Sequence, residues 1–199
     1  MQHDSDFSQQ ESLALIQEMI NKAKNRFSEG GHLYLVWGWV VLACSLGQFV
    51  LLHFLHSDKH YWVWGATWLA FIYQLIYLTR RNKEQKARTY THDIIKYVWI
   101  VFVLTMALMV FLVIMIVGKD SYKVIGPIFL VLYGMPSFLS GIILQFRPLV
   151  IGAIGCWILS AIAPFITYDY RLLLVSAAMV IAWIIPGYKL NQKYKKENA

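Results

Sequence analysis

Long runs without charged residues are the feature that most limits how this chain can fold. A helix needs roughly 17 to 25 mostly apolar residues to cross the hydrocarbon of a bilayer. Six such segments are predicted, at residues 33–55, 61–79, 94–117, 124–144, 149–167 and 172–188. Their apolar residues are continuous rather than alternating, and lipid cannot satisfy the backbone of an open strand. The predicted fold class is all-α, a polytopic membrane protein with six transmembrane helices.

Composition supports this class of membrane protein. Hydrophobic residues make up 58% of the chain and charged residues 15%, against about 25% charged in typical soluble domains. We divide the chain into a cytoplasmic N-terminal segment (1–31), a transmembrane domain (32–188) and a basic cytoplasmic tail (189–199). The first long apolar run begins only at Leu33, so no cleaved targeting segment is expected.

The positions of lysine and arginine predict the orientation of the spans. Cytoplasmic flanks of bacterial spans collect these residues. All but four of the 18 Lys and Arg residues fall on the side that carries both termini. The four on the other side are Lys59, Lys119, Lys123 and Arg171. We expect a multi-pass protein with both termini in the cytoplasm.

No pattern in the sequence predicts an enzyme or a cofactor. The predicted spans contain no Asp or Glu, the usual relays of proton-coupled transport, and Lys96 is their only formal charge. The nucleophile elbow, the H-E-x-x-H zinc motif and a glycine-rich phosphate loop are absent from the sequence. Cys44 and Cys156 lie in apolar runs, where a thiol behaves as a small hydrophobe. The net charge of +7 follows from topology, so we expect no direct nucleic-acid binding.

Three histidines after the first span form a pattern that resembles a metal site. His53, His56 and His60 would share one face of a continued helix, with Asp58 nearby, and these are ligand types for zinc or copper. Asp58 and His60 fit a turn better, and histidines are common at a membrane interface. We predict no metal site, and metal binding stays open as the alternative.

Small residues and a proline mark the fourth and fifth spans. Pro136 should kink the fourth span, because it lacks an amide proton and clashes with the carbonyl of Leu132. Broken helices mark substrate sites in some transporters, so Gly134, Pro136 and Ser137 are a candidate ligand pocket. In the fifth span, Gly152, Cys156 and Ser160 recur every four residues, which predicts a helix-packing face.

Two glutamines are the most polar residues well inside the spans. Gln48 lies in the outer part of the first span and Gln74 in the inner part of the second. At different depths they should not pair directly, and each is expected to hydrogen-bond to a neighbouring helix. Each follows a Trp-Gly pair, Trp37-Gly38 and Trp64-Gly65, which forms a short internal repeat.

The first 31 residues predict an amphipathic helix from about 9 to 29, with a capping box at Ser8 and Glu11 and a stop at Gly30. Its apolar residues recur at spacings of three and four and form one narrow stripe, here called the docking seam: Leu13, Ile16, Ile20, Ala23 and Phe27. A lipid-surface helix should carry excess positive charge, which the glutamates cancel here. A coiled coil needs three or four heptads, and the seam covers about two. Docking onto protein is therefore favoured, either within this chain, onto a second copy or onto a cytoplasmic partner.

The run NKAKNRFSEGGHLYLVWGWVVL, with the basic linker that follows the second aromatic-rich span, resembles an uncharacterised family of small six-span membrane proteins of Bacteroidota. The resemblance covers the whole chain. It implies a bacterial inner membrane and carries no activity with it.

Two functional hypotheses follow from these features. The first is a non-enzymatic inner-membrane protein for sensing, regulation or protein docking through its N-terminal helix, with the bilayer and a homo-oligomer or cytoplasmic protein as partners. The alternative is a small-solute transporter or channel whose pathway lies near Pro136 in the fourth span.

Overall fold

A computed structural model describes residues 12–20, 31–56, 59–84, 90–118 and 121–197. These residues form helices joined by short turns and contain no strand, which confirms the all-helical prediction. The first elements are α2 (Gly31–His53), the 3-10 helix η1 (His60–Gly65), α3 (Ala66–Glu84) and α4 (Tyr90–Val117). They are followed by α5 (Ser121–Ile143), α6 (Arg147–Ile162), η3 (Ala163–Phe165), α7 (Tyr168–Met179), η4 (Val180–Ile184) and α8 (Ile185–Glu197).

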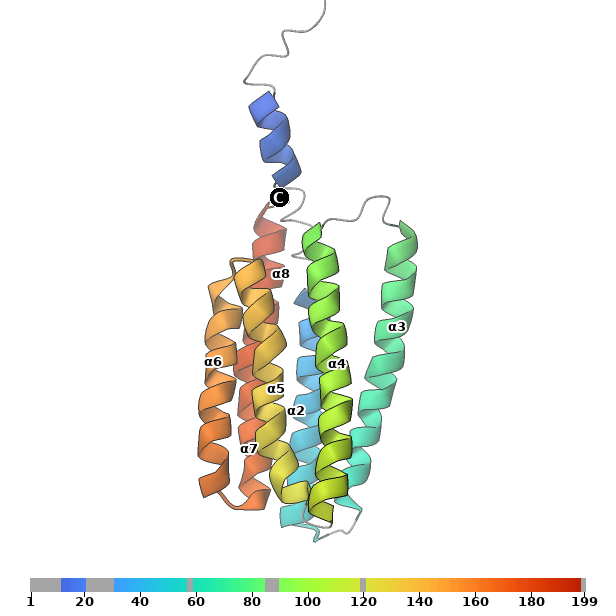
Figure 1. Ribbon diagram of the computed structural model, residues 1–199, viewed down its shortest axis with the longest axis vertical. Coiled ribbons are helices and arrows are strands. Elements are labelled where there is room, and N and C mark those ends of the chain that lie inside the picture. The colour runs from blue at the N-terminus through green and yellow to red at the C-terminus, as the bar shows by residue number, and fades with distance from the viewer. Residues whose placement is uncertain (1–11, 21–30, 57–58, 85–89, 119–120, 198–199) are drawn as a thin grey trace, which may run out of the picture.

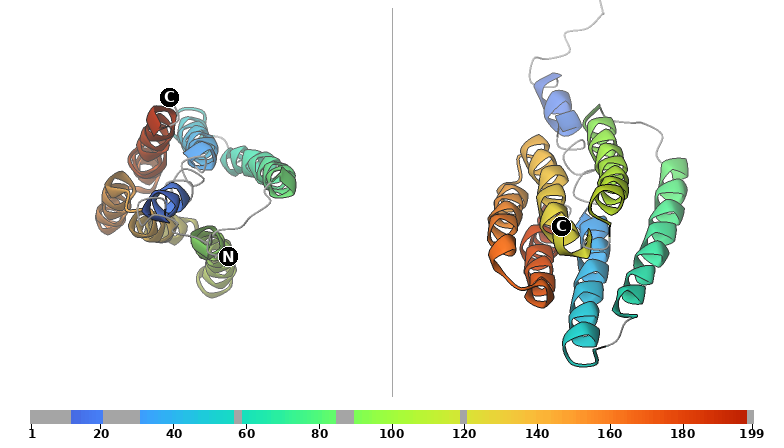
Figure 2. Two further views of the ribbon diagram at one scale, coloured as in Figure 1. Left: turned by 90° about the horizontal axis from the view of Figure 1, so that it is seen from above. Right: turned by 60° about the horizontal axis from the view of Figure 1, so that its bottom comes forward.

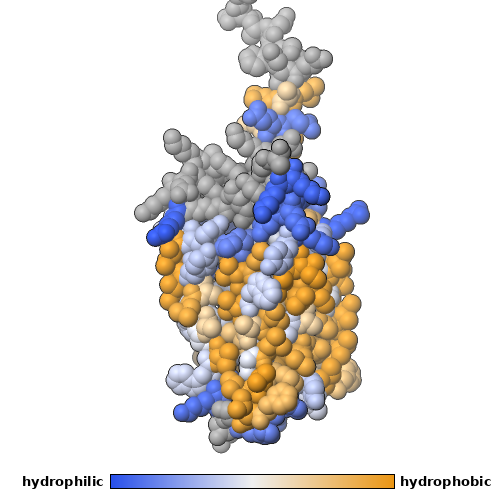
Figure 3. Space-filling model, turned by 180° about the vertical axis from the view of Figure 1, so that it is seen from behind, coloured by the Kyte–Doolittle hydropathy of each residue, from blue (hydrophilic) through white to orange (hydrophobic). Residues whose placement is uncertain are grey.

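Five helical stretches are long and apolar enough to cross a membrane: Gly31–His53, Ile94–Val117, Ser121–Ile143, Arg147–Phe165 and Tyr168–Lys193. Apolar side chains cover the middle of the molecule, while polar ones gather towards its two ends (Figure 3). These are the features of a multi-pass membrane protein. The predicted second span is formed by η1 and α3, which are not among the five because Arg80, Arg81 and Lys83 occupy the last turns of α3.

The long helices run side by side and alternate in direction (Figure 1). We call the end with Gly31, Lys96 and Arg147 the basic end, and the end with His53 and Tyr168 the histidine end. α5 packs against α6 and α4, and α2 packs against α7 and α8. α3 packs against α2, and seen from above α3 and α4 lie apart at the margin of the bundle (Figure 2).

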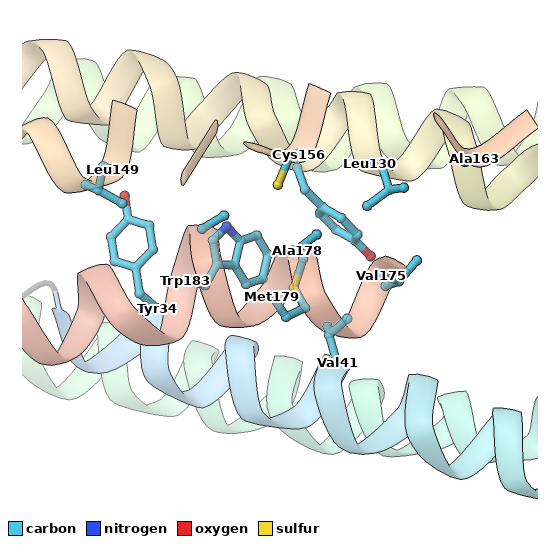
Figure 4. Packing of buried hydrophobic residues seen from close by; sticks show 12 residues of the cluster. Tyr34, Val41, Leu130, Leu149, Cys156, Ala163, Val175, Ala178, Met179 and Trp183 are labelled. Carbon is cyan, nitrogen blue, oxygen red and sulfur yellow. The ribbon is translucent and has the colours of Figure 1, made fainter. Parts of the chain in front are cut away.

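The hydrophobic core lies between α2, α5, α6, α7 and η4 (Figure 4). Its buried members are Tyr34, Val41, Leu130, Tyr133, Leu149, Cys156, Ala163, Val175, Ala178, Met179, Ala182 and Trp183. Among the side chains described for the two outer helices, α3 buries only Ala70 and α4 only Ile95 and Val113. The buried core is therefore formed mainly by helices other than α3 and α4.

The last predicted span, 172–188, is the middle of a longer helical stretch. α7, η4 and α8 follow one another without a break, and η4 is a π-helical turn. Pro186 has no N–H to offer the carbonyl of Ala182 in η4, which accounts for a change of hydrogen-bond register here. Residues 189–197, predicted as a tail, continue the helix because neither Pro nor Gly interrupts them.

Residues 12–20 form a helix whose side chains are all exposed. Leu13, Ile16 and Ile20 of the docking seam belong to it. Ala23 and Phe27, and the rest of the predicted helix 9–29, lie outside the described residues.

Candidate functional site

Gln48 is the centre of a polar cluster near the histidine end. It lies in α2 and is only 5% exposed. Its Oε1 accepts a hydrogen bond from the indole Nε1 of Trp64 at 2.6 Å. Its Nε2 lies 2.9 Å from Nδ1 of His60 and donates to the hydroxyl of Tyr168 at 3.4 Å. One amide thus joins α2, η1 and the start of α7.

The hydrogen bonds around Gln48 show which atom of His60 is the acceptor. An indole N–H can only donate, so the amide oxygen must face Trp64. The amide nitrogen, which also only donates, then faces Nδ1 of His60. Nδ1 is therefore the acceptor of this hydrogen bond.

The three histidines whose sequence pattern resembles a metal site have different surroundings. Nδ1 of His53 lies 3.4 Å from Oδ2 of Asp169, and both side chains are 37% exposed. His60 bonds to Gln48, and His56 adopts a left-handed backbone with φ of 46°. Asp58 lies outside the described residues. Within the described part of the chain, no group of three His, Cys, Asp or Glu residues is placed to hold a metal ion.

A second set of polar contacts joins α2 and α3 nearer the basic end. Nε1 of Trp37 donates to Oε1 of Gln74 at 2.5 Å. Nε2 of His32 lies 2.8 Å from the hydroxyl of Tyr73. Each glutamine thus bonds to the neighbouring helix, as predicted.

The two glutamine contacts are reciprocal. Trp37 of α2 donates to Gln74 of α3, and Trp64 of η1 donates to Gln48 of α2. We call the pairs Trp37–Gln74 and Trp64–Gln48 the two clasps. The Trp-Gly repeat in the sequence corresponds to this antiparallel arrangement, but spacing alone could not show which tryptophan meets which glutamine.

The predicted ligand pocket lies inside the packed core. Ser137 donates to the carbonyl of Tyr133 at 3.1 Å and accepts from the indole Nε1 of Trp183 at 2.9 Å. Pro136 is fully buried, and α5 continues as a helix through it. At Gly134, an added Cβ would collide with the indole of Trp157. Indole rings therefore pack against both ends of this segment, and a ligand there remains a prediction.

The predicted packing face of α6 lies against two neighbours. An added Cβ at Gly152 would be 2.6 Å from Cα of Ala182 and 2.7 Å from the carbonyl oxygen of Ile181. Cys156 is fully buried in the core. Ser160 donates to the carbonyl of Pro127 in α5 at 2.8 Å. The α6 backbone thus approaches η4 at Gly152, a distance that only glycine permits.

Two hydroxyls in the packed part have no hydrogen-bond partner. They belong to Tyr34 in α2 and Ser140 in α5, and they are the buried side-chain polar atoms without a partner among the described residues. An unsatisfied buried polar group costs about 1–3 kcal/mol. Other buried hydroxyls are paired, such as those of Ser45 and Ser176 at 2.7 Å.

An open groove of about 720 Å³ lies between η1–α3 and α4. One wall includes Trp64, Gly65 and Trp68, and the other is formed by Met106, Ala107 and Val110. A Cβ added at Gly65 would meet nothing within 4 Å. The volume falls in the range of about 300–1,000 Å³ that is usual for ligand sites. The sequence does not predict this groove, because its two walls are far apart in the chain and the Trp64-Gly65 pair on one wall indicates only an internal repeat.

No family model matches this chain, and neither curated proteins nor solved structures include a significant match. The function is therefore argued from the chain's own residues.

Proposed function

We propose that this protein is a non-enzymatic, multi-pass protein of a bacterial inner membrane that docks a protein through its N-terminal helix. The bundle anchors the helix, and sensing or regulation follows from what the helix binds. The observation that carries the proposal is the exposure of the three described residues of the docking seam. Leu13, Ile16 and Ile20 are each more than half exposed on the helix of residues 12–20.

An exposed apolar stripe in water favours burial against a partner. Removing apolar surface from water is worth about 25 cal/mol per Å². The seam is too short for a coiled coil, and its charges do not suit an anionic lipid surface. Protein is the remaining class of partner, and a second copy of this chain or a cytoplasmic protein would provide it.

The six-span topology of the proposal is supported by the path of α3. Five spans are apolar enough by themselves, whereas α3 is less so. Yet α3 runs antiparallel to α2 along much of its length (Figure 1). One clasp, Trp37–Gln74, joins α2 to α3, and the other, Trp64–Gln48, joins α2 to η1, which leads directly into α3. Interhelical hydrogen bonds of this kind stabilise helix pairs in membranes. With α3 as a crossing, the number of spans is even and both termini lie at the basic end.

The cytoplasmic assignment of the basic end follows from its charge. Arg80, Lys96, Arg147 and Lys189 lie there, whereas described cations at the histidine end are Lys59, Lys123 and Arg171. At the histidine end, the Arg171 side chain donates to the backbone carbonyls of Ile166, Pro164 and Lys123. The positive-inside rule then directs the N-terminal helix into the cytoplasm.

The docking proposal is tested by charge substitution in the seam. A variant with Ile16→Asp and Ile20→Asp should lose cross-linked dimers or partners that the full chain gives in native membranes. The matched control is Ala14→Asp with Gln17→Asp, which adds the same charges to the same helix away from the seam. Affinity purification of the full chain beside a deletion of residues 1–29 then identifies the bound protein.

The outcomes separate the alternatives. A cross-link between two copies supports a dimer, and a cross-link to another protein supports a cytoplasmic partner. Equal cross-linking in the seam variant and the control would contradict docking through the seam. Solute flux in proteoliposomes that depends on Ser137 would instead favour the transporter hypothesis.

A further inference from the structure

We propose that the groove between η1–α3 and α4 is a binding site for one acyl chain of a membrane lipid. This inference rests on the proposed insertion of α3 in the bilayer, and it is independent of docking through the N-terminal helix. The occupant is identified by three properties of the groove: its depth in the membrane, the chemistry of its walls and its continuity with the lipid-facing surface.

The α4 wall of the groove lies at the depth of the hydrocarbon, while the opposite wall begins at Tyr61, near the histidine end. The α4 wall begins at Met106, at the middle of the span Ile94–Val117, and ends at Val110. At this depth the surrounding medium consists of acyl chains rather than headgroups.

Two polar groups of the walls, on Trp64 and Thr67, are bonded within the protein, and Tyr61 and Trp68 complete the polar part of the lining. The indole N–H of Trp64 donates to Gln48, away from the groove's apolar side chains. The hydroxyl of Thr67, which also lines the groove, donates to the carbonyl of Trp64 at 2.6 Å. A polar ligand would find these groups occupied, whereas an apolar chain leaves them undisturbed.

Small residues create the space and large ones limit it. Gly65 on one wall and Ala107 on the other leave room between Trp64, Trp68 and Met106. The clasp to Gln48 orients the Trp64 ring, so this wall is held in place. An elongated, flexible chain fits such a slot, and affinity comes from van der Waals contact because lipid tails give no hydrophobic driving force of their own.

The groove is continuous with the exposed surface of α4. Leu104 and Phe111, on the adjoining face of α4, are both more than half exposed, and so is Leu108 on the far face. Of an 18-residue stretch within the α4 span, only 6% is buried in the molecule. This surface faces the hydrocarbon, so a lipid chain reaches the groove sideways, directly from the bilayer.

The test uses a photoreactive lipid. The full chain is placed in nanodiscs of phosphatidylethanolamine and phosphatidylglycerol with a small share of phosphatidylethanolamine that carries a diazirine midway along one acyl chain. After illumination, labelled residues are mapped by mass spectrometry. We expect strong labelling of Trp68, Met106 and Ala107, and weaker labelling of Leu104 and Phe111. Even labelling around α4 would overturn the proposal.

Filling the groove should remove the site. Gly65→Leu should lower labelling of Met106 and Ala107 by about tenfold, equivalent to about 1.4 kcal/mol of binding. Gly126→Leu is the matched control, because a Cβ there also meets nothing within 4 Å but lies in α5 outside the groove. Ala107→Leu fills the groove from the opposite wall and serves if Gly65→Leu does not fold. Unchanged labelling in a folded, filled variant would overturn the proposal.

Two further readouts distinguish the sources of failure. A diazirine fatty acid added to the same nanodiscs tests whether a free acyl chain competes with the phospholipid, and competition supports a site for the chain itself. If Leu69 and Ile72 of α3 take no label at all, α3 is outside the bilayer, and both the six-span topology and the groove site are wrong. If they are labelled but the groove residues are not enriched, only the groove proposal fails.

Discussion

The two sides of this bundle use similar apolar side chains in opposite ways. Within the span Tyr168–Lys193, 56% of an 18-residue stretch is buried inside the molecule, against 6% of an equal stretch within Ile94–Val117, which is the more apolar of the two. The packed side, formed by α2, α5, α6, α7, η4 and α8, brings backbones together at small residues. The open side, formed by α3 and α4, presents large apolar side chains outwards. In a membrane protein, the most apolar helix is therefore the one that meets lipid, and burial is marked by small and hydroxyl-bearing residues.

The manner of attachment also differs between the sides. On the packed side, glycine lets α6 approach η4 within backbone contact. On the open side, α3 is joined to α2 by the clasp Trp37–Gln74 and by the pair of His32 and Tyr73, and the preceding η1 is joined to α2 by the clasp Trp64–Gln48. We infer that α3 is held mainly by directional polar bonds, which allows it to stand away from α4 and leave the groove between them.

The largest expected difference in stability between the packed side and the open side comes from truncating one tryptophan on each side. Trp183 is 1% exposed and bonds to Ser137, whereas Trp68 is 71% exposed. Trp183→Ala should lower the free energy of unfolding by about 3–5 kcal/mol, because it leaves a cavity and removes the hydrogen bond to Ser137. Trp68→Ala should change it by less than about 0.5 kcal/mol. Unfolding in mixed micelles measures both, and equal losses would remove the distinction between the two sides.

A smaller effect is expected from adding one methyl group. Gly152→Ala places a Cβ against the backbone of η4 and should cost about 1–3 kcal/mol of unfolding free energy. Gly126→Ala, where the Cβ meets nothing, should be neutral or stabilising by up to about 1 kcal/mol. The same titration in mixed micelles checks the pair. A neutral Gly152→Ala would show that close backbone approach is not what holds α6.

The smallest effect should appear on the open side and stay local. Gln48→Leu removes the acceptor of Trp64 and the donor to His60, and membrane hydrogen bonds average roughly 0.6 kcal/mol with a maximum near 1.7. Amide hydrogen exchange should quicken in η1 and α3 and remain unchanged in α5 and α6. Leu42→Ile, a nearby apolar change on α2, is the control. Faster exchange throughout the bundle would contradict the view that α3 is a separately held helix.

The sequence predicted much of the fold, because hydrophobic runs and helix-breaking residues are local signals. The absence of strands was predicted, and the predicted spans lie within a few residues of the observed helices, apart from the last. That helix extends to Glu197, since apolar length marks the membrane boundary but not the end of a helix. Which helix lies on the outside is a matter of pairing between distant segments, which periodicity does not contain.

The site was predictable only in part for the same reason. Polarity inside an apolar run singled out Gln48 and Gln74, whereas their indole partners came from the tertiary structure. Gly134 and Ser137 suggested a pocket, and the structure places Trp157 and Trp183 against them. No local pattern in the sequence predicted the groove at Gly65 and Ala107. Its shape depends on how far apart α3 and α4 lie, although they are consecutive in the chain.

By itself, the sequence determined the solvent of this protein, its helical class and the charge difference between its ends, because each depends on how many apolar or basic residues occur in a row. Only the tertiary structure decided which faces are buried, which indole meets which amide and where a groove stays open. Helix packing depends on the shape complementarity of surfaces far apart in the chain. In a bilayer, apolar side chains are similarly stable inside the bundle and against lipid, so composition alone does not predict which helices are buried.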